Sequence, residues 1–105
     1  MNVSILSDRA VFEISRNTNT GRIEFLKVFL PVDGVIGGCP LEISRTNLIK
    51  DIKDGKAVYT AVNKGAEWIR GEDVRVTSAG YLRADMNDTT EDNLGTLPEY
   101  HKLFA

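Results

Sequence analysis

The sequence predicts an α+β domain in which a mainly antiparallel sheet of about five strands carries one short helix on one face. Three observations lead to this prediction. A β-hairpin pattern occupies residues 11–30, a single helical pattern follows near the middle of the chain, and three short strand patterns come after it. Because strands and helix are segregated along the chain, this class is favoured over an alternating, parallel sheet.

The first hairpin is predicted from alternation and from a turn-forming loop. Residues 11–16 alternate between apolar and polar side chains, which places Phe12 and Ile14 on one face of a half-buried strand. Residues 17–21 read Asn-Thr-Asn-Thr-Gly, and Asn and Gly tolerate the positive φ angles of a tight loop. Residues 22–30 form the returning strand.

The returning strand has a break in its alternation. One set, Ile23 and Phe25, shares a face, and the other set comprises Leu26, Val28 and Leu30. Because side chains alternate with a period of two, one regular register cannot bury both sets on a single face. Either a bulge near Phe25–Leu26 switches the face, or the strand is covered on both sides; the bulge is our prediction.

A helix is predicted over residues 45–54. Ser44 is typical of a helix N-cap, and Gly55 is a C-terminal stop signal. One apolar stripe is formed by Leu48, Ile49 and Ile52. A helix of this length does not persist alone in water, so we expect the stripe to pack on the sheet. Before the helix, residues 31–40 form a long loop that is rich in Gly and Pro.

The remaining chain predicts three strands and no linker between domains. The third strand spans residues 57–62 and is turned by 63–65, the fourth contains Val74 and Val76, and the fifth spans residues 81–84 after a tight turn at 78–80. We therefore expect one domain over residues 1–105, with fraying at about 1–9 and 101–105.

Composition is ordinary and excludes little. The chain has 105 residues, 42% hydrophobic and 27% charged, with a net charge of −2. No basic stripe is present, which disfavours a nucleic-acid groove. Cys39 is the single cysteine and is interpreted as a small buried hydrophobe, so no disulfide within the chain is expected and a reducing, cytoplasmic location is predicted. The N-terminal residues resemble neither a signal peptide nor a membrane helix.

The second half of the chain resembles a family of small bacterial and phage proteins catalogued as "domain of unknown function 3892". The resemblance covers roughly residues 44–100 and rests on the helix ending Asp54-Gly55, Val58-Tyr59-Thr60 leading to Asn63, Val74-Arg75-Val76, Gly80-Tyr81-Leu82-Arg83, Asp92-Asn93-Leu94 and Leu97-Pro98. Ala84 departs from the Thr that members carry, and the N-terminal hairpin is longer than expected of the family. The resemblance implies a common fold and no activity.

Patterns for catalysis and metal binding are weak. Cys39 and His101 are the only Cys and His, and nothing in the sequence places them together. The loop from Asp85 to Asp92 is rich in oxygen-bearing side chains, but it lacks the glycine and the terminal glutamate of a calcium loop. We therefore predict no enzyme activity, no cofactor and no metal.

Binding is the remaining function. Arginine and aromatic side chains anchor interfaces and anionic ligands, and the candidates are Trp68, Arg70, Tyr81 and Arg83. A purely structural role in the core edge and in an ion pair explains the same residues. The prediction is a small, non-catalytic interaction module that binds a macromolecule, itself included, or a small anionic ligand. Two alternatives stay open: a phage-encoded host-interaction or inhibitor protein, and an unrecognised metal- or nucleotide-handling enzyme.

The segment from Asp92 to Pro98 is predicted to be a structural clasp. Asp92 and Asn93 can cap exposed backbone amides in a turn, and Leu94 and Leu97 are spaced to enter the edge of the core. Pro98 stiffens the exit from this segment.

Overall fold

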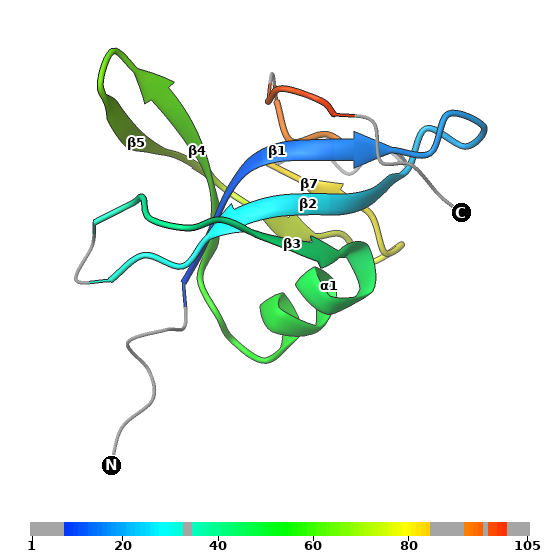
Figure 1. Cartoon of the computed structure of the whole chain (residues 1–105). Coiled ribbons are helices and arrows are strands. Elements are labelled where there is room, and N and C mark those ends of the chain that lie inside the picture. The colour runs from blue at the N-terminus through cyan, green and yellow to red at the C-terminus, as the bar shows by residue number, and fades with distance from the viewer. Residues whose placement is uncertain (1–7, 33–34, 85–91, 96, 101–105) are drawn as a thin grey trace.

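The computed structural model describes residues 8–32, 35–84, 92–95 and 97–100. The fold is α+β, with a five-stranded sheet in the order β3-β2-β1-β4-β5 and a separate two-stranded sheet, β6-β7 (Figure 1). The elements are β1 (Arg9–Arg16), β2 (Ile23–Phe29), β3 (Leu41–Ser44), α1 (Arg45–Lys53), β4 (Val58–Lys64), β5 (Glu67–Asp73), β6 (Arg75–Val76) and β7 (Leu82–Arg83).

The sheet is mixed, which corrects the prediction of a mainly antiparallel one. β1 pairs in parallel with β4 through Arg9, Ala10 and Val11, whereas the β1–β2, β2–β3 and β4–β5 pairs are antiparallel. The chain leaves β3 through α1 and re-enters the sheet on the far side of β1. Such a connection makes β4 run in the same direction as β1, and no local sequence pattern reports it.

β2 carries a bulge as predicted, but the bulge lies between Ile23 and Phe25 and not at Phe25–Leu26, so the expectation that Ile23 and Phe25 share a face is wrong. β1 carries a second bulge. The register of the β1–β2 pair shifts twice, between Val11 and Glu13 and between Ser15 and Arg16. At the second shift, Ser15 pairs with Phe25 and Arg16 pairs with Ile23. The second shift lets Ile23, Leu26 and Val28 enter one core. The first separates Phe12 from Ile14, so the expectation that these two share a face is wrong.

The helix and the first loop form as predicted. Ser44 accepts a hydrogen bond from the Asn47 N–H at 3.2 Å, and Gly55 follows the helix with a φ of 92°. In the first loop, the Asn17 side-chain oxygen accepts from the N–H groups of Asn19 and Thr20. The start of the helix and the first loop are therefore set by local side chains, and the end of the helix by the backbone freedom of Gly55, which explains why the sequence predicts them.

The run after the helix differs from the prediction. The chain turns after Lys64 into β5, a strand of seven residues that the sequence analysis missed, and the short strand β3 was missed as well. The predicted fourth and fifth strands leave the main sheet and pair with each other as β6 and β7. β5 lies at a sheet edge and is mostly exposed, so it lacks the apolar alternation that marks a half-buried strand.

Two clusters of apolar side chains occupy opposite faces of the sheet. Consecutive residues of one strand point to opposite faces, and the pairs Val28–Phe29 and Val58–Tyr59 divide between the clusters. The larger cluster contains Leu48 of α1 and Leu82 of β7 and also Val11, Ile14, Ile23, Leu26, Val28, Val58, Val74, Leu94 and Leu97. The smaller cluster contains Ala10, Phe29, Tyr59 and Ala61, with Phe12, Ile36 and Trp68 packed against it.

Candidate functional site

Three aromatic rings meet on the face of the sheet that carries the smaller cluster. Phe12 of β1 stacks on Phe29 of β2 with ring centroids 4.4 Å apart, and Trp68 of β5 meets both rings edge-on at 5.2 and 5.1 Å. Phe29 is buried, whereas Phe12 and Trp68 are half-buried. Two of the three rings therefore combine rigid packing with an accessible surface, which is the usual character of an interface anchor.

Arg70 extends this aromatic surface along β5. Its guanidinium lies 4.0 Å from the ring centroid of Tyr59 and forms an ion pair with Asp73 at 3.0 Å. Burial raises the pKa of Tyr59, and the charge of Asp8 adds to the effect. The arrangement holds Tyr59 neutral and Arg70 stacked, a cation–π contact between a buried ring and an exposed cation.

A pocket of about 390 Å³ opens beside Trp68. Its apolar wall comes from Phe12, Ala61, Trp68 and Pro98, and its polar groups come from Glu13 and Asn63. The volume lies near the lower end of the range for ligand sites, about 300–1,000 Å³. The space suits a side chain or a similarly small group.

A second pocket of about 290 Å³ shares two lining residues, Val62 and Leu97, with the first. The shared residues come from β4 and from the segment that follows Asp92. Figure 1 shows the β4–β5 hairpin diverging from β1 while the orange-red C-terminal segment runs along β1. Both pockets are therefore lined by β4 and by that segment together.

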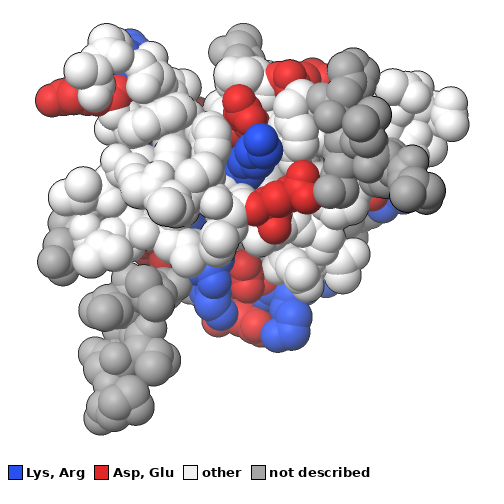
Figure 2. Space-filling model, viewed as in Figure 1, with Lys and Arg blue, Asp and Glu red and all other residues white. Residues whose placement is uncertain are grey.

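Four polar side chains contact one another beside the aromatic rings: Glu13, Lys27, Glu42 and Tyr100. Lys27 lies 4.6 Å from the ring centroid of Tyr100 and 3.7 Å from a Glu13 oxygen, and the Tyr100 hydroxyl donates to Glu42 at 2.8 Å. Burial and the bond to Glu42 raise the pKa of Tyr100, so this hydroxyl stays protonated. In Figure 2, basic and acidic side chains meet at the centre of the view and uncharged side chains surround them.

The structure brings together only part of the predicted site. Trp68 and Arg70 lie on one face of β5, two residues apart. Tyr81 and Arg83 lie in the β6–β7 hairpin and flank Leu82, which packs in the larger core with the helix. Arg83 is only 3% exposed. Trp68 and Arg70 therefore lie in the five-stranded sheet and Tyr81 and Arg83 in the separate β6–β7 hairpin, where Arg83 is part of the packed structure.

Sequence reasoning missed Phe12, Phe29 and Tyr59 as partners of Trp68. A signal for them exists in hindsight, because Val28-Phe29 and Val58-Tyr59 are consecutive apolar residues within strands. Consecutive apolar residues are typical of strands that are covered on both faces.

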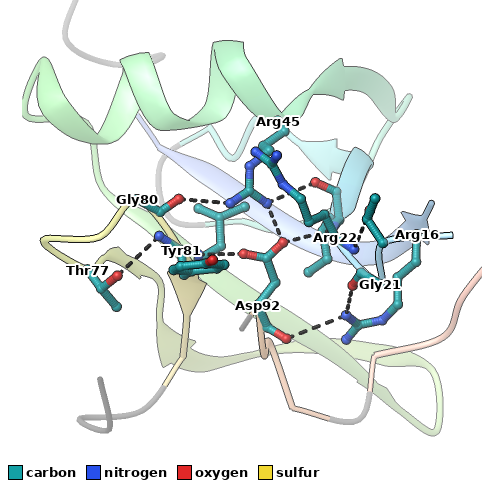
Figure 3. A network of polar contacts seen from close by, with 11 residues as sticks. Arg16, Gly21, Arg22, Arg45, Thr77, Gly80, Tyr81 and Asp92 are labelled. Atoms are coloured by element: carbon teal, nitrogen blue, oxygen red, sulfur yellow. Dashed lines mark hydrogen bonds and ion pairs between the residues drawn. The ribbon is translucent and has the colours of Figure 1, made fainter. Parts of the chain in front are cut away.

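The predicted clasp is present, and it reaches farther than predicted. The buried Asp92 carboxylate forms an ion pair with Arg45 and accepts from the main-chain N–H groups of Ile23 and Leu82, both at 2.8 Å. Arg45 also donates to the carbonyl oxygens of Ile23 and Gly80 at 3.1 and 2.8 Å (Figure 3).

The rest of the clasp is apolar and local. Leu94 and Leu97 are 1% and 7% exposed, and the Asn93 side chain accepts from the Gly95 N–H at 2.8 Å. No buried side-chain nitrogen or oxygen among the described residues lacks a hydrogen-bond partner, and we assign the network to stability.

The described residues offer little for metal or nucleophilic chemistry. They contain no group of three or more His, Cys, Asp and Glu side chains that could hold a metal ion. Residues 85–91 of the acidic loop and His101 lie outside the described residues. Cys39 is exposed, which corrects its interpretation as a buried hydrophobe, because it follows two glycines with positive φ in a loop away from the core.

Comparison with family models, with curated proteins and with solved structures gives no match for this chain. The resemblance of residues 44–100 to the bacterial and phage family stays a prediction. Within the described residues, no helix has the length and apolar character needed to cross a membrane.

Proposed function

We propose that the protein is a non-catalytic binding module that takes hold of a protein partner through its aromatic face. The main support for this proposal is the contact of Phe12, Phe29 and Trp68 beside the 390 Å³ pocket. Aromatic residues in well-packed surroundings with an accessible edge dominate the energy of protein interfaces. The packed rings are already ordered, so binding costs them little conformational entropy.

The same arrangement favours a protein over a small anion as the ligand. Of the described residues that line the pocket, Glu13 alone is charged, and it is negative. Arg70 is paired with Asp73, and Arg83 is buried in the β6–β7 hairpin. The two predicted arginines therefore do not line a common cavity. The pocket instead offers an apolar wall on which a side chain of a partner protein can pack.

The test is a selection of peptides on the intact chain. A library of randomised seven-residue peptides displayed on filamentous phage is panned on the immobilised protein, with counter-selection on the variant Trp68→Ala. We expect enriched peptides that bind the parent at least about tenfold more tightly than Trp68→Ala, since loss of a hot-spot side chain costs about 2 kcal/mol or more and about 1.4 kcal/mol corresponds to tenfold. The matched control is Ile69→Ala, because Ile69 lies on the same strand, points to the opposite face and is 40% exposed.

Trp68 also gives a readout without mutation, because it is the only tryptophan in the chain. Covering its half-exposed ring should shift its fluorescence emission to shorter wavelength as a selected peptide is added. A parallel selection without the counter-selection supplies the opposite outcome. If all of its peptides bind parent, Trp68→Ala and Ile69→Ala equally, with unchanged emission, the aromatic face is rejected as the binding surface.

A further inference from the structure

The main sheet is incomplete between β1 and β4. Their parallel pairing ends at Val11 and Thr60, although β4 continues to Lys64. Farther along β1, Ile14 pairs instead with the C-terminal segment: its N–H donates to the Pro98 carbonyl at 3.0 Å, and its carbonyl accepts from the Tyr100 N–H at 2.9 Å. β1 thus has two neighbours on this side, β4 near its start and the C-terminal segment farther along. We call the space between these two neighbours the fork, and the edge of β4 beyond Thr60 that faces β1, its inner edge, borders it.

The register shows which backbone groups border that fork. Along a strand, main-chain groups point alternately to the two sides. The Ala57 carbonyl accepts from the Arg9 N–H on the β1 side, and the Val58 carbonyl accepts from the Val74 N–H on the other side. Continuing this alternation, Val62 faces β5 and Asn63 faces the fork. Among the described residues no ladder partner reaches Asn63 from that side, and Asn63 is exposed.

The pocket beside Trp68 lies at this same fork, because Ala61 and Asn63 of β4 line it together with Pro98 of the C-terminal segment. A strand edge that has no ladder partner among the described residues, next to a side-chain pocket, is the arrangement by which proteins bind extended peptides. Main-chain hydrogen bonds supply affinity, and the pocket selects one side chain.

Charge indicates which side chain fits. Glu13 gives the pocket a carboxylate at its rim, with a side chain 32% exposed and a Lys27 contact of 3.7 Å that leaves room for a second cation. The same face already holds two cations against aromatic rings, Arg70 on Tyr59 and Lys27 on Tyr100. An arginine or lysine can lay its aliphatic stem on Trp68 and direct its charge to Glu13.

We propose that the protein binds an extended, basic segment of a partner protein, which adds as a short strand to the inner edge of β4 at Asn63 and inserts an arginine or lysine beside Trp68 and Glu13. This proposal rests on the proposed function and specifies its partner and its geometry. The segment pairs with Asn63 through main-chain groups, and the anchor residue occupies the 390 Å³ pocket.

The experiment uses the peptides selected above and compares their sequences and backbone chemistry. We expect the enriched peptides to carry Arg or Lys at one position. Replacing that residue by Leu, or changing the protein by Glu13→Gln, should each weaken binding about fivefold to tenfold, and the two changes together should cost little more than one. The matched control is Glu67→Gln, an exposed acid at the start of β5.

Strand addition has its own readout. Methylation of a single peptide nitrogen that faces β4 should weaken binding about tenfold, whereas methylation of the next nitrogen along should not. On binding, hydrogen exchange should slow at the Asn63 N–H. By the same alternation the Trp68 N–H points to the outer edge of β5, and its exchange should stay unchanged.

The outcomes separate the two proposals. Selected peptides that depend on Trp68 but tolerate every N-methylation and show no basic preference would keep the proposed function and overturn this inference. Protection of the Trp68 N–H in place of Asn63 would also overturn it, because the strand would then lie on the outer edge of β5. The absence of any peptide that depends on Trp68 would remove the proposed function itself.

Discussion

Arg45 and Asp92, 47 positions apart in the chain, form an ion pair whose side chains are 6% and 0% exposed. Arg45 is the first residue of α1, and Asp92 opens the C-terminal segment. The pair also binds main-chain groups of Ile23 at the start of β2 and Gly80 before β7. Four parts of the chain thus meet at one ion pair, and its hydrogen bonds to main-chain groups reduce the cost of burying the two charges.

Replacing Asp92 by Asn should destabilise the fold by about 3–5 kcal/mol. The change leaves the Arg45 guanidinium buried without its counter-charge. It also replaces one of the two carboxylate oxygens by an NH2 donor, so the Leu82 N–H or the Ile23 N–H loses its acceptor. Urea unfolding monitored by circular dichroism gives the measurement. The control is Glu99→Gln, since the Arg16–Glu99 pair is more exposed and should contribute less than about 1 kcal/mol. Equal losses for both variants would contradict this account.

The Asp92 contribution should depend on pH. Burial alone would raise the pKa of Asp92, but hydrogen bonds from Arg45 and from the Leu82 and Ile23 amides outweigh it, so the pKa lies below its ordinary 3.8. The unfolded chain therefore takes up this proton first as the pH falls. The stabilisation is present above the ordinary pKa and is lost as the pH drops below 3.8 toward the lowered value.

The measurement is the free energy of unfolding of the parent and of Asp92→Asn between about pH 6 and pH 2. The difference between the two proteins should be constant near pH 6 and should narrow below about pH 4. Titration of the other carboxylates is shared by both proteins and cancels in this difference. A gap that widens on acidification would mean that Asp92 is held protonated in the folded protein.

Local chemistry made part of the fold predictable. Ser44 and Gly55 delimit α1, Asn17 and Gly21 form the first loop, and the broken alternation of residues 23–30 indicated a bulge in β2. The parallel β1–β4 pair could not be predicted, because it depends on where the chain returns after the helix. Strand β5 was not predicted because both of its faces are largely exposed, so burial imposes no apolar–polar pattern on its sequence.

The candidate site was only half predictable for a similar reason. Trp68 stands out in the sequence as the single tryptophan, but Phe12 and Phe29 reach it from other strands, and their positions follow from sheet order and from the bulge after Val11. Asp92 was predicted as a local cap. Its partner Ile23 lies 69 positions earlier, and no spacing rule links two such residues.

The clasp, residues 92–98, should stabilise the fold, and its residues should contribute unequally to the free energy of unfolding. Leu97→Ala should cost about 2–4 kcal/mol and Leu94→Ala about 2–5 kcal/mol, because both side chains are buried in the main core. Asn93→Ala should cost only about 1 kcal/mol, since its side chain is exposed and caps one amide, that of Gly95. Chemical unfolding gives these values, and native-state hydrogen exchange at Leu94 should be slow. Parent-like unfolding of both leucine variants would identify the segment as loosely attached.

The residues of the apolar stripe on α1 should contribute unequally to the free energy of unfolding. Leu48 is 0% exposed and belongs to the main core, whereas Ile52 is only half-buried against it. Leu48→Ala should therefore lose about 2–5 kcal/mol, and Ile52→Ala clearly less. Thermal unfolding of the two variants compares them directly. If Ile52→Ala were the more damaging change, the helix would have to sit rotated about its axis relative to this structure.

Gly71 should resist substitution because of Thr60 rather than because of its own backbone. A Cβ atom at Gly71 would lie far inside van der Waals contact with the Thr60 hydroxyl, which is held by the Glu72 N–H at 3.0 Å. Gly71→Ala should therefore cost about 1–3 kcal/mol in the parent. In a Thr60→Ala background the hydroxyl is absent, and only the main-chain oxygen of residue 60, 3.3 Å from the added Cβ, stays close. The same substitution should then cost about 1–2 kcal/mol less, and the lower entropy of the unfolded chain offsets part of what remains.

Gly65 provides the matched control for this cycle. It turns the β4–β5 hairpin with a φ of 66°, and no atom lies near the Cβ position, so Gly65→Ala is strained by backbone conformation alone. Its cost in urea unfolding should be the same with Thr or Ala at position 60. The Gly71 and Thr60 changes should instead show a coupling energy of about 1–2 kcal/mol, the signature of two groups that compete for one space. The register of the β4–β5 pair shifts between Tyr59 and Ala61. Additive costs for Gly71→Ala and Thr60→Ala would show that the hairpin opens at this shift to admit the methyl group.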